Sequence, residues 1–94
     1  MHISHVPADG RVLLANVDWQ RVRGNLGLSL RELQVVQHIF EGKTLSVIAR
    51  EMRLGLGTVK TYSQRVYRKL DVTNRQELTL LVVGAHLQLA DTIA

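Results

Sequence analysis

Residues 54–70, LGLGTVKTYSQRVYRKL, constrain the fold of this chain more than any other segment. Wound as a helix at about 100° per residue, they separate into two chemically opposite sides. The apolar side carries Val59, Val66 and Leu70. The other, here called the polar side, has no acid: Thr58, Lys60, Thr61, Gln64, Arg65 and Arg68. The pattern favours a helix that binds a nucleic acid, where cations neutralise phosphates and Gln, Thr and Arg reach base edges.

The positive charge of the chain is concentrated around this segment. The net charge of +4 and the pI near 10.1 are weak evidence alone, because many small basic domains bind no nucleic acid. Residues 50–75, however, carry seven cations against Glu51 and Asp71, whereas residues 76–94 sum to −2. Such a concentration is typical of a nucleic-acid-binding surface.

Length and composition predict one small domain. The 94 residues, 46% of them hydrophobic, suffice for a modest core and three or four helices. The absence of cysteine excludes disulfides and thiolate metal sites. The first residues lack the basic-then-apolar order of a signal peptide, and the most apolar window, residues 78–89, is too short to span a bilayer. We therefore expect a cytoplasmic protein without a membrane partner.

Local signals predict an all-α fold. Ser29 with Glu32 forms a capping box for a helix over residues 30–41, and Thr44 caps a second helix over residues 45–53. In the first helix, the apolar positions with helical spacing are Leu30, Leu33, Val36, Ile39 and Phe40. In the second, the apolar face consists of Leu45, Ile48, Ala49 and Met52.

The remaining helices follow a short glycine-containing turn. A third helix covers residues 57–69, and a fourth runs to about residue 90, capped either by Thr73 with Gln76 or by Asn74 with Glu77. The second and third helices have the spacing of a helix-turn-helix motif. We divide the chain into a main domain and a preceding N-terminal arm or short extra element: 26–94 and 1–25.

The N-terminal element is ambiguous from the sequence. Residues 11–16 fit a strand or the start of a helix, whereas Asp18 fits the cap of a short turn that carries Trp19 and Val22. We expect Trp19 to cover the outside of the core at the first main helix.

The segment from residue 28 to residue 78 resembles the LuxR-type helix-turn-helix domain of bacterial transcription regulators. The matching residues are spread over all four expected helices: Leu28-Ser29, Arg31-Glu32, Gly42, Ile48-Ala49, Met52, Leu54, Thr58-Val59-Lys60, Lys69-Leu70, Val72 and Asn74-Arg75. The resemblance implies a four-helix domain that binds double-stranded DNA, with the third helix in the major groove and the fourth forming a homodimer. It assigns base reading to Lys60, Thr61 and Gln64, and phosphate or additional base contacts to Thr58, Arg65 and Arg68.

Four positions depart from the family pattern. An acid is usual at Val47, a polar residue at Leu45, a capping Ser at Gly55 and a His at Tyr62. Replacing a Ser cap by Gly costs only about a few tenths of a kcal/mol, so the fold is retained. Most members also carry a sensing domain, which 28 upstream residues cannot hold. We therefore expect a stand-alone effector or a fragment of a longer protein.

Simpler interpretations apply to several residues. Tyr62 and Tyr67 lie at the edges of the apolar side and fit a core better than base stacking. Gly55 and Gly57 fit turn formation and an approach of backbone amides to a phosphate equally well. The histidines are scattered and no catalytic, phosphate-loop or dinucleotide motif occurs, so we expect no metal, no cofactor and no enzymatic activity.

Two other functions are alternatives to transcription regulation through DNA binding by this chain. An interaction module would pair with another regulator or contact RNA polymerase without binding DNA, and the apolar Leu45 and Val47 favour it. A promoter-reading module similar to region four of a sigma factor shares the topology. That module normally works with a second, aromatic-bearing one, for which 94 residues leave no room.

The fourth helix carries two apolar stripes, and a second stripe requires a second partner. We expect the first stripe to face the core: Leu78, Leu81, Val82, Ala85 and Leu89. We expect the second, here called the outer stripe, to form the dimer interface: Leu80, Val83, Gly84 and Leu87. The alternative is that the segment around Val12, Leu13 and Val17 folds back over the outer stripe.

Overall fold

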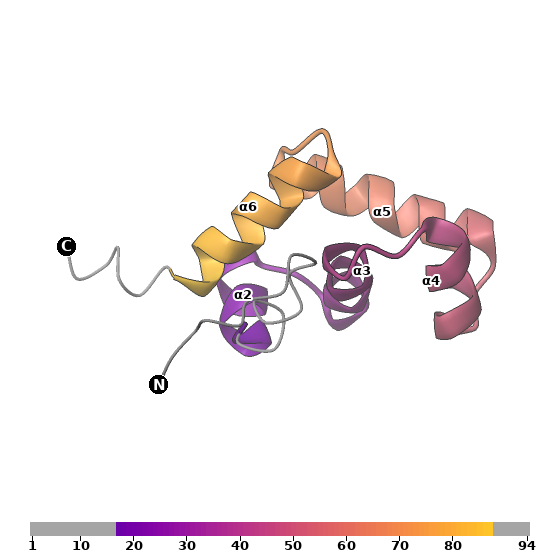
Figure 1. Cartoon of the computed structure of the whole chain (residues 1–94), viewed down its shortest axis with the longest axis horizontal. Helices are drawn as coiled ribbons and strands as arrows, with labels where there is room; N and C mark the ends of the chain where they lie inside the picture. The colour runs from indigo at the N-terminus through magenta and orange to yellow at the C-terminus, as the bar shows by residue number, and fades with distance from the viewer. Residues whose placement is uncertain (1–16, 88–94) are drawn as a thin grey trace, which may run out of the picture.

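The computed structural model describes residues 17–87, which form five α-helices and no strand (Figure 1). The helices are α2 (Trp19–Leu26), α3 (Leu30–Phe40), α4 (Leu45–Met52), α5 (Leu56–Leu70) and α6 (Arg75–His86). The all-α prediction is confirmed, and α3 to α5 begin and end within one residue of their expected limits. No helix in the described range is long and apolar enough to cross a membrane.

Side-chain caps begin the helices where the sequence indicates. Ser29 and Glu32 form both hydrogen bonds of the capping box at α3, and Thr44 caps α4. Of the two candidate caps for α6, the structure uses Asn74, whose side chain accepts a hydrogen bond from the backbone N–H of Glu77 at 2.8 Å. These bonds satisfy amide donors that the first turn of a helix leaves unpaired.

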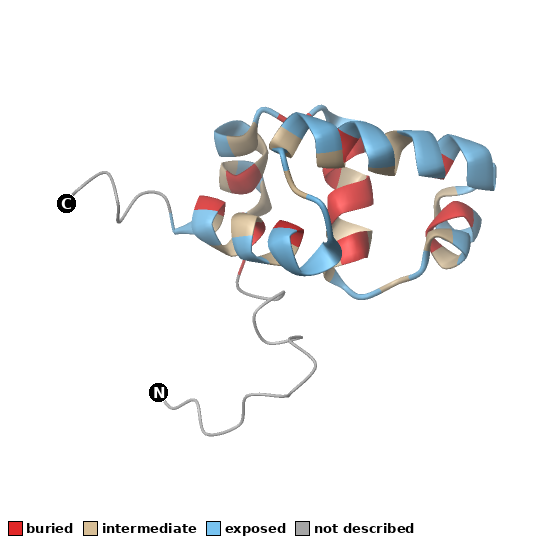
Figure 2. Ribbon diagram, turned by 90° about the horizontal axis from the view of Figure 1, so that it is seen from above, coloured by how far each residue is buried: buried red, intermediate tan, exposed pale blue. Residues whose placement is uncertain are grey.

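The core lies around α3, which is central and is contacted by α2, α4, α5 and α6 (Figure 2). Side chains from all five helices are almost completely buried there: Val22, Val35, Val36, Ile39, Ile48, Val59, Val66, Leu78 and Val82. Leu30 keeps the helical spacing of the apolar positions of α3 but is 54% exposed. As the first residue of α3, its side chain lies beyond the packed turns of the helix.

An additional helix, α2, forms where the sequence was ambiguous. Asp18 caps it by accepting a hydrogen bond from the backbone N–H of Arg21 at 3.1 Å. The Trp19 ring packs edge-on against Phe40 of α3, with 5.4 Å between ring centroids. Trp19 therefore covers the core as expected, and α2 raises the number of described helices above the predicted three or four. Residues 11–16 lie outside the described range.

Helix α2 also holds the end of α6. Arg21 Nη1 donates a hydrogen bond to the backbone oxygen of His86 at 3.1 Å, and Asn25 Nδ2 donates one to that of Ala85 at 2.9 Å. Carbonyls in the last turn of a helix lack partners within the helix, and these side chains supply them. In the structure α6 ends at His86, before the predicted end near residue 90.

Candidate nucleic-acid interface

Helices α4 and α5 meet through a short turn at one end of the molecule (Figure 1). The turn begins at Arg53, which ends α4 in the left-handed conformation with φ of 57°. The backbone N–H of Leu54 then donates a hydrogen bond to the carbonyl of Ala49 at 2.9 Å. Gly55 caps α5 without a side-chain hydrogen bond. The predicted helix-turn-helix arrangement is therefore present.

The two sides of α5 differ in burial as their composition predicts. Val59 and Val66 are completely buried, and Leu70 is half-buried. All six residues of the polar side are exposed: Thr58, Lys60, Thr61, Gln64, Arg65 and Arg68. Figure 2 shows α5 with much of its length exposed at the edge of the fold. The fold thus presents the expected DNA-binding side chains together on one surface.

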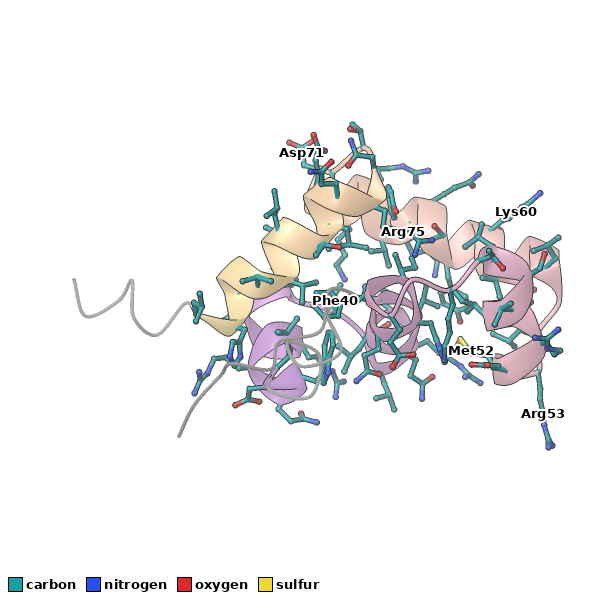
Figure 3. The ribbon with its side chains drawn as sticks, viewed as in Figure 1. Phe40, Met52, Arg53, Lys60, Asp71 and Arg75 are labelled. Atoms are coloured by element: carbon teal, nitrogen blue, oxygen red, sulfur yellow. The ribbon has the colours of Figure 1, made fainter. Side chains whose placement is uncertain are left out.

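The cations of the polar side have no acidic partner in the described part of the chain. Within residues 17–87, Lys60, Arg65 and Arg68 form no side-chain hydrogen bond or ion pair, and Lys60 extends away from the fold (Figure 3). Arg65 places its guanidinium carbon 5.5 Å from the centroid of the Tyr62 ring, within the range of a cation–π contact. Their charge is therefore available to an anionic ligand.

Two other cations of residues 50–75 have a structural role instead. Lys69 Nζ bonds to Glu32 Oε1 at 2.8 Å, which ties α5 to α3. Arg75 donates to the backbone oxygens of Ile39 and Lys43 at 2.8 and 2.9 Å, and Figure 3 shows it at the start of α6 above α3. The sequence-based charge concentration therefore overestimates the charge available for binding.

The contact between α5 and α3 is formed by the buried carboxylate of Glu32 and the ammonium of Lys69. The hydrogen bond from Lys69 and the bond from the backbone N–H of Ser29 lower the pKa of Glu32 from its usual 4.5. Its side chain is only 7% exposed, so the ionised form depends on these donors. Sequence reasoning identified Glu32 as a capping residue but missed its pairing with Lys69, because the two are 37 positions apart.

A second polar cluster joins the end of α3 to α4. Lys43 Nζ lies 2.8 Å from Glu41 Oε1 and 2.7 Å from Glu51 Oε1, and these bonds raise the pKa of Lys43. His38 Nδ1 lies 3.1 Å from the same ammonium. This cluster fixes the loop before α4. In the described range, no group of three or more His, Asp or Glu side chains is arranged to hold a metal ion.

An open depression lies on the exposed surface of α5. Its lining residues are Thr58, Thr61, Tyr62 and Arg65. Thr61 Oγ1 donates a hydrogen bond to the backbone oxygen of Gly57 at 3.0 Å. Tyr62 and Tyr67 are half-buried and pack against the core, as predicted.

The two stripes of α6 also differ in burial. Leu78, Val82 and Ala85 are buried, Leu81 is half-buried, and Leu89 lies outside the described residues. In the outer stripe, Leu80 is 66% and Leu87 52% exposed, Gly84 is exposed and Val83 is half-buried.

The N-terminal segment that was the alternative partner for the outer stripe lies only partly within the described residues. Val17 is buried in the core, whereas Val12 and Leu13 lie outside the described residues. Leu80 and Leu87 are exposed within the described part of the chain.

Comparisons with known proteins agree with this architecture. Residues 26–82 match the family model described as "Bacterial regulatory proteins, luxR family". The chain is 37% identical over 51 residues to the monoamine regulon transcriptional regulator of Klebsiella aerogenes, covering 54% of this chain and 22% of that protein. It is 44% identical over 48 residues to the probable transcriptional regulatory protein NarL of Mycobacterium tuberculosis, covering 51% and 22%.

A third relative is the response regulator UvrY of Escherichia coli, 34% identical over 67 residues, covering 71% of this chain and 31% of UvrY. The chain thus spans less than a third of the length of these relatives. A comparison with solved structures found no match.

Proposed function

Because the chain belongs to the luxR family of bacterial regulatory proteins, we propose that it regulates transcription by sequence-specific binding to double-stranded DNA. The observation that carries the proposal is the acid-free polar side of α5, all of whose residues are exposed on the second helix of a helix-turn-helix. A helix in that position fits the major groove of DNA with its outer side toward the bases.

Two kinds of contact divide the polar side. Lys60, Thr61 and Gln64 read base edges: Lys matches the acceptors of guanine, and Gln matches the donor and acceptor of adenine. A second group fixes the position of the helix through phosphates or additional base contacts: Thr58, Arg65 and Arg68. Lys60, Arg65 and Arg68 form no ion pair within residues 17–87, which supports a role in binding for all three, because no internal bond has to break when DNA binds.

The proposed active form is a homodimer joined through the outer stripe of α6. Leu80 on α6 and Leu87, the C-cap of that helix, are 66% and 52% exposed and lie seven residues apart, so they share a face. Gly84, between them, has no heavy atom within 4 Å of its would-be Cβ, which leaves space for a second backbone. Two-fold pairing would make the stripe self-complementary and set the spacing of two half-sites in the DNA.

Replacing Leu80 and Leu87 together by Lys tests the dimer. The introduced lysines of the two chains would repel one another at the interface, so we expect a monomer with DNA affinity reduced by at least tenfold. Sedimentation measures the oligomeric state, and thermal melting shows whether the variant is folded. Leu30→Lys is the matched control, since Leu30 is an exposed leucine on another helix. An unmodified protein that is monomeric both at micromolar concentration and on DNA would contradict the dimer.

Selection of bound sites from random double-stranded DNA tests the function itself. We expect enrichment of one sequence with two-fold symmetry, bound through α5. No enrichment and no salt-dependent affinity for any duplex would contradict the proposal and favour an interaction module that contacts another regulator or RNA polymerase.

A further inference from the structure

The open depression on α5 is lined by Thr58, Thr61, Tyr62 and Arg65. We infer that it receives the 5-methyl group of a thymine, and that Thr61 recognises this base through its own γ-methyl group. The inference rests on the proposed function, since it specifies what the same surface recognises in DNA.

Helical spacing brings the lining residues together. Thr58, Thr61, Tyr62 and Arg65 are three or four positions apart, so their side chains are neighbours on the helix surface. Thr58 and Thr61 are exposed, whereas Tyr62 is half-buried and packs against the core, which fixes its ring as one wall. The result is an open hollow lined by two threonines, a tyrosine and an arginine.

The hydroxyl of Thr61 is already used within the helix. Its bond to the carbonyl of Gly57, at 3.0 Å, engages the only proton that Thr61 could donate to a base. A threonine that bonds back to the preceding turn is also restricted in χ1. Thr61 then offers a ligand its γ-methyl group and the lone pairs of its hydroxyl oxygen but no proton, and among the four bases only thymine presents a methyl group in the major groove.

Arg65 and Tyr62 complete the subsite. The guanidinium lies 5.5 Å from the centre of the Tyr62 ring, so the ring holds a cation at the rim of the hollow. In that position Arg65 can neutralise a phosphate of the DNA backbone while the hollow covers the methyl group. Tyr62 acts here as a positioning residue for Arg65.

Deoxyuridine provides the test, because it pairs like thymidine but lacks the methyl group. Each thymine of the selected site is replaced in turn, and binding is measured for the unmodified protein, Thr61→Ser and Thr61→Val. For the unmodified protein we expect a roughly fourfold loss at one position of each half-site, the value for one buried methyl group. Thr61→Val keeps the γ-methyl and should retain this loss. Thr61→Ser keeps only the hydroxyl and should bind thymine and uracil equally.

The outcomes separate the inference from the proposed function. Specific binding to the selected site with equal affinity for thymine and uracil at every position overturns the inference alone. So does a uracil effect that Thr61→Ser retains and Thr61→Val loses, because the hydroxyl would then be the reading group. If no duplex is bound specifically, the proposed function and the inference fail together. Thermal melting of both variants confirms that they are folded.

Discussion

Arg68 and Lys69 are consecutive residues of α5 with the same charge and opposite roles. Lys69 bonds to the nearly buried Glu32 of α3 at 2.8 Å and lowers its pKa. Arg68 is exposed and has no side-chain partner within residues 17–87. A step of about 100° around the helix axis separates a cation that holds the fold together from one that is available to a phosphate.

The comparison shows that the number of cations in a segment is a poor measure of its binding surface. What matters is whether the fold places an acceptor within reach of each cation. Glu32 reaches Lys69, and the backbone oxygen of Ile39 near the end of α3 accepts a hydrogen bond from Arg75. Lys60, Arg65 and Arg68 remain exposed. Two of the seven cations of residues 50–75 are therefore used within the fold, and five have no side-chain partner within residues 17–87: Arg50, Arg53, Lys60, Arg65 and Arg68.

The largest expected effects concern the base-reading residues. Gln64→Ala and Lys60→Ala should each lose about 1–3 kcal/mol of discrimination between the selected site and scrambled DNA, because both remove direct base contacts. Arg68→Ala should weaken binding to both DNAs alike, as expected for a phosphate contact. Measured affinities for the two duplexes decide this, and equal losses on both for Gln64→Ala would remove Gln64 from the base-reading group.

The next largest effect is a difference in folding stability between variants of Lys69 and of Arg68. Lys69→Met leaves the Glu32 carboxylate buried without its main donor, so we expect a loss of about 1–2 kcal/mol in the free energy of unfolding, reduced because Lys69 is partly exposed. Arg68→Met is the matched control and should change stability by less than about 0.5 kcal/mol. Urea denaturation measures both, and equal losses would contradict the assignment of different roles.

The same pair predicts a dependence on pH. Since the folded-state pKa of Glu32 is lowered, its stabilisation is complete above the usual value of 4.5 and is lost as the pH falls through the lowered value. The unfolding free energy of the unmodified protein should therefore decline in acid. Lys69→Met should decline less over that range. Denaturation at pH 6 and at acidic pH measures the loss of unfolding free energy for both proteins. Equal losses in the unmodified protein and in Lys69→Met would contradict the Lys69–Glu32 pair.

The smallest expected effect is at the cap of α5. Gly55 has φ of −69° and ψ of 152°, and a Cβ there would meet only Thr58 Oγ1 at 4.0 Å. Gly55→Ser should therefore fit and add a side-chain acceptor for the first turn, raising stability by about a few tenths of a kcal/mol. Thermal melting measures the change, and a destabilised variant would show that the cap has another constraint.

Local signals in the sequence predicted much of this architecture. The helix starts are marked by capping residues that bond to residues three positions away: Ser29 with Glu32, Thr44 and Asn74. The helical spacing of Val59 and Val66 predicts that both are buried, as they are in the structure. The contacts that the sequence did not reveal are long-range. Lys69 with Glu32, Arg75 with Ile39, and α2 with α6 depend on how helices pack, which periodicity within one helix does not encode.

The salt dependence of DNA affinity tests the central claim most directly, because it counts the phosphates that the protein neutralises. About three phosphate contacts per chain, made by Arg65, Arg68 and one of the exposed flanking residues Arg50 and Arg53, would give about six contacts in a dimer and a log–log slope near −5 for duplex DNA. We expect Arg68→Met to make the slope shallower by about 2 and Lys69→Met to leave it unchanged. A slope shallower than about −2 for the unmodified protein, or equal changes in the two variants, would contradict the account.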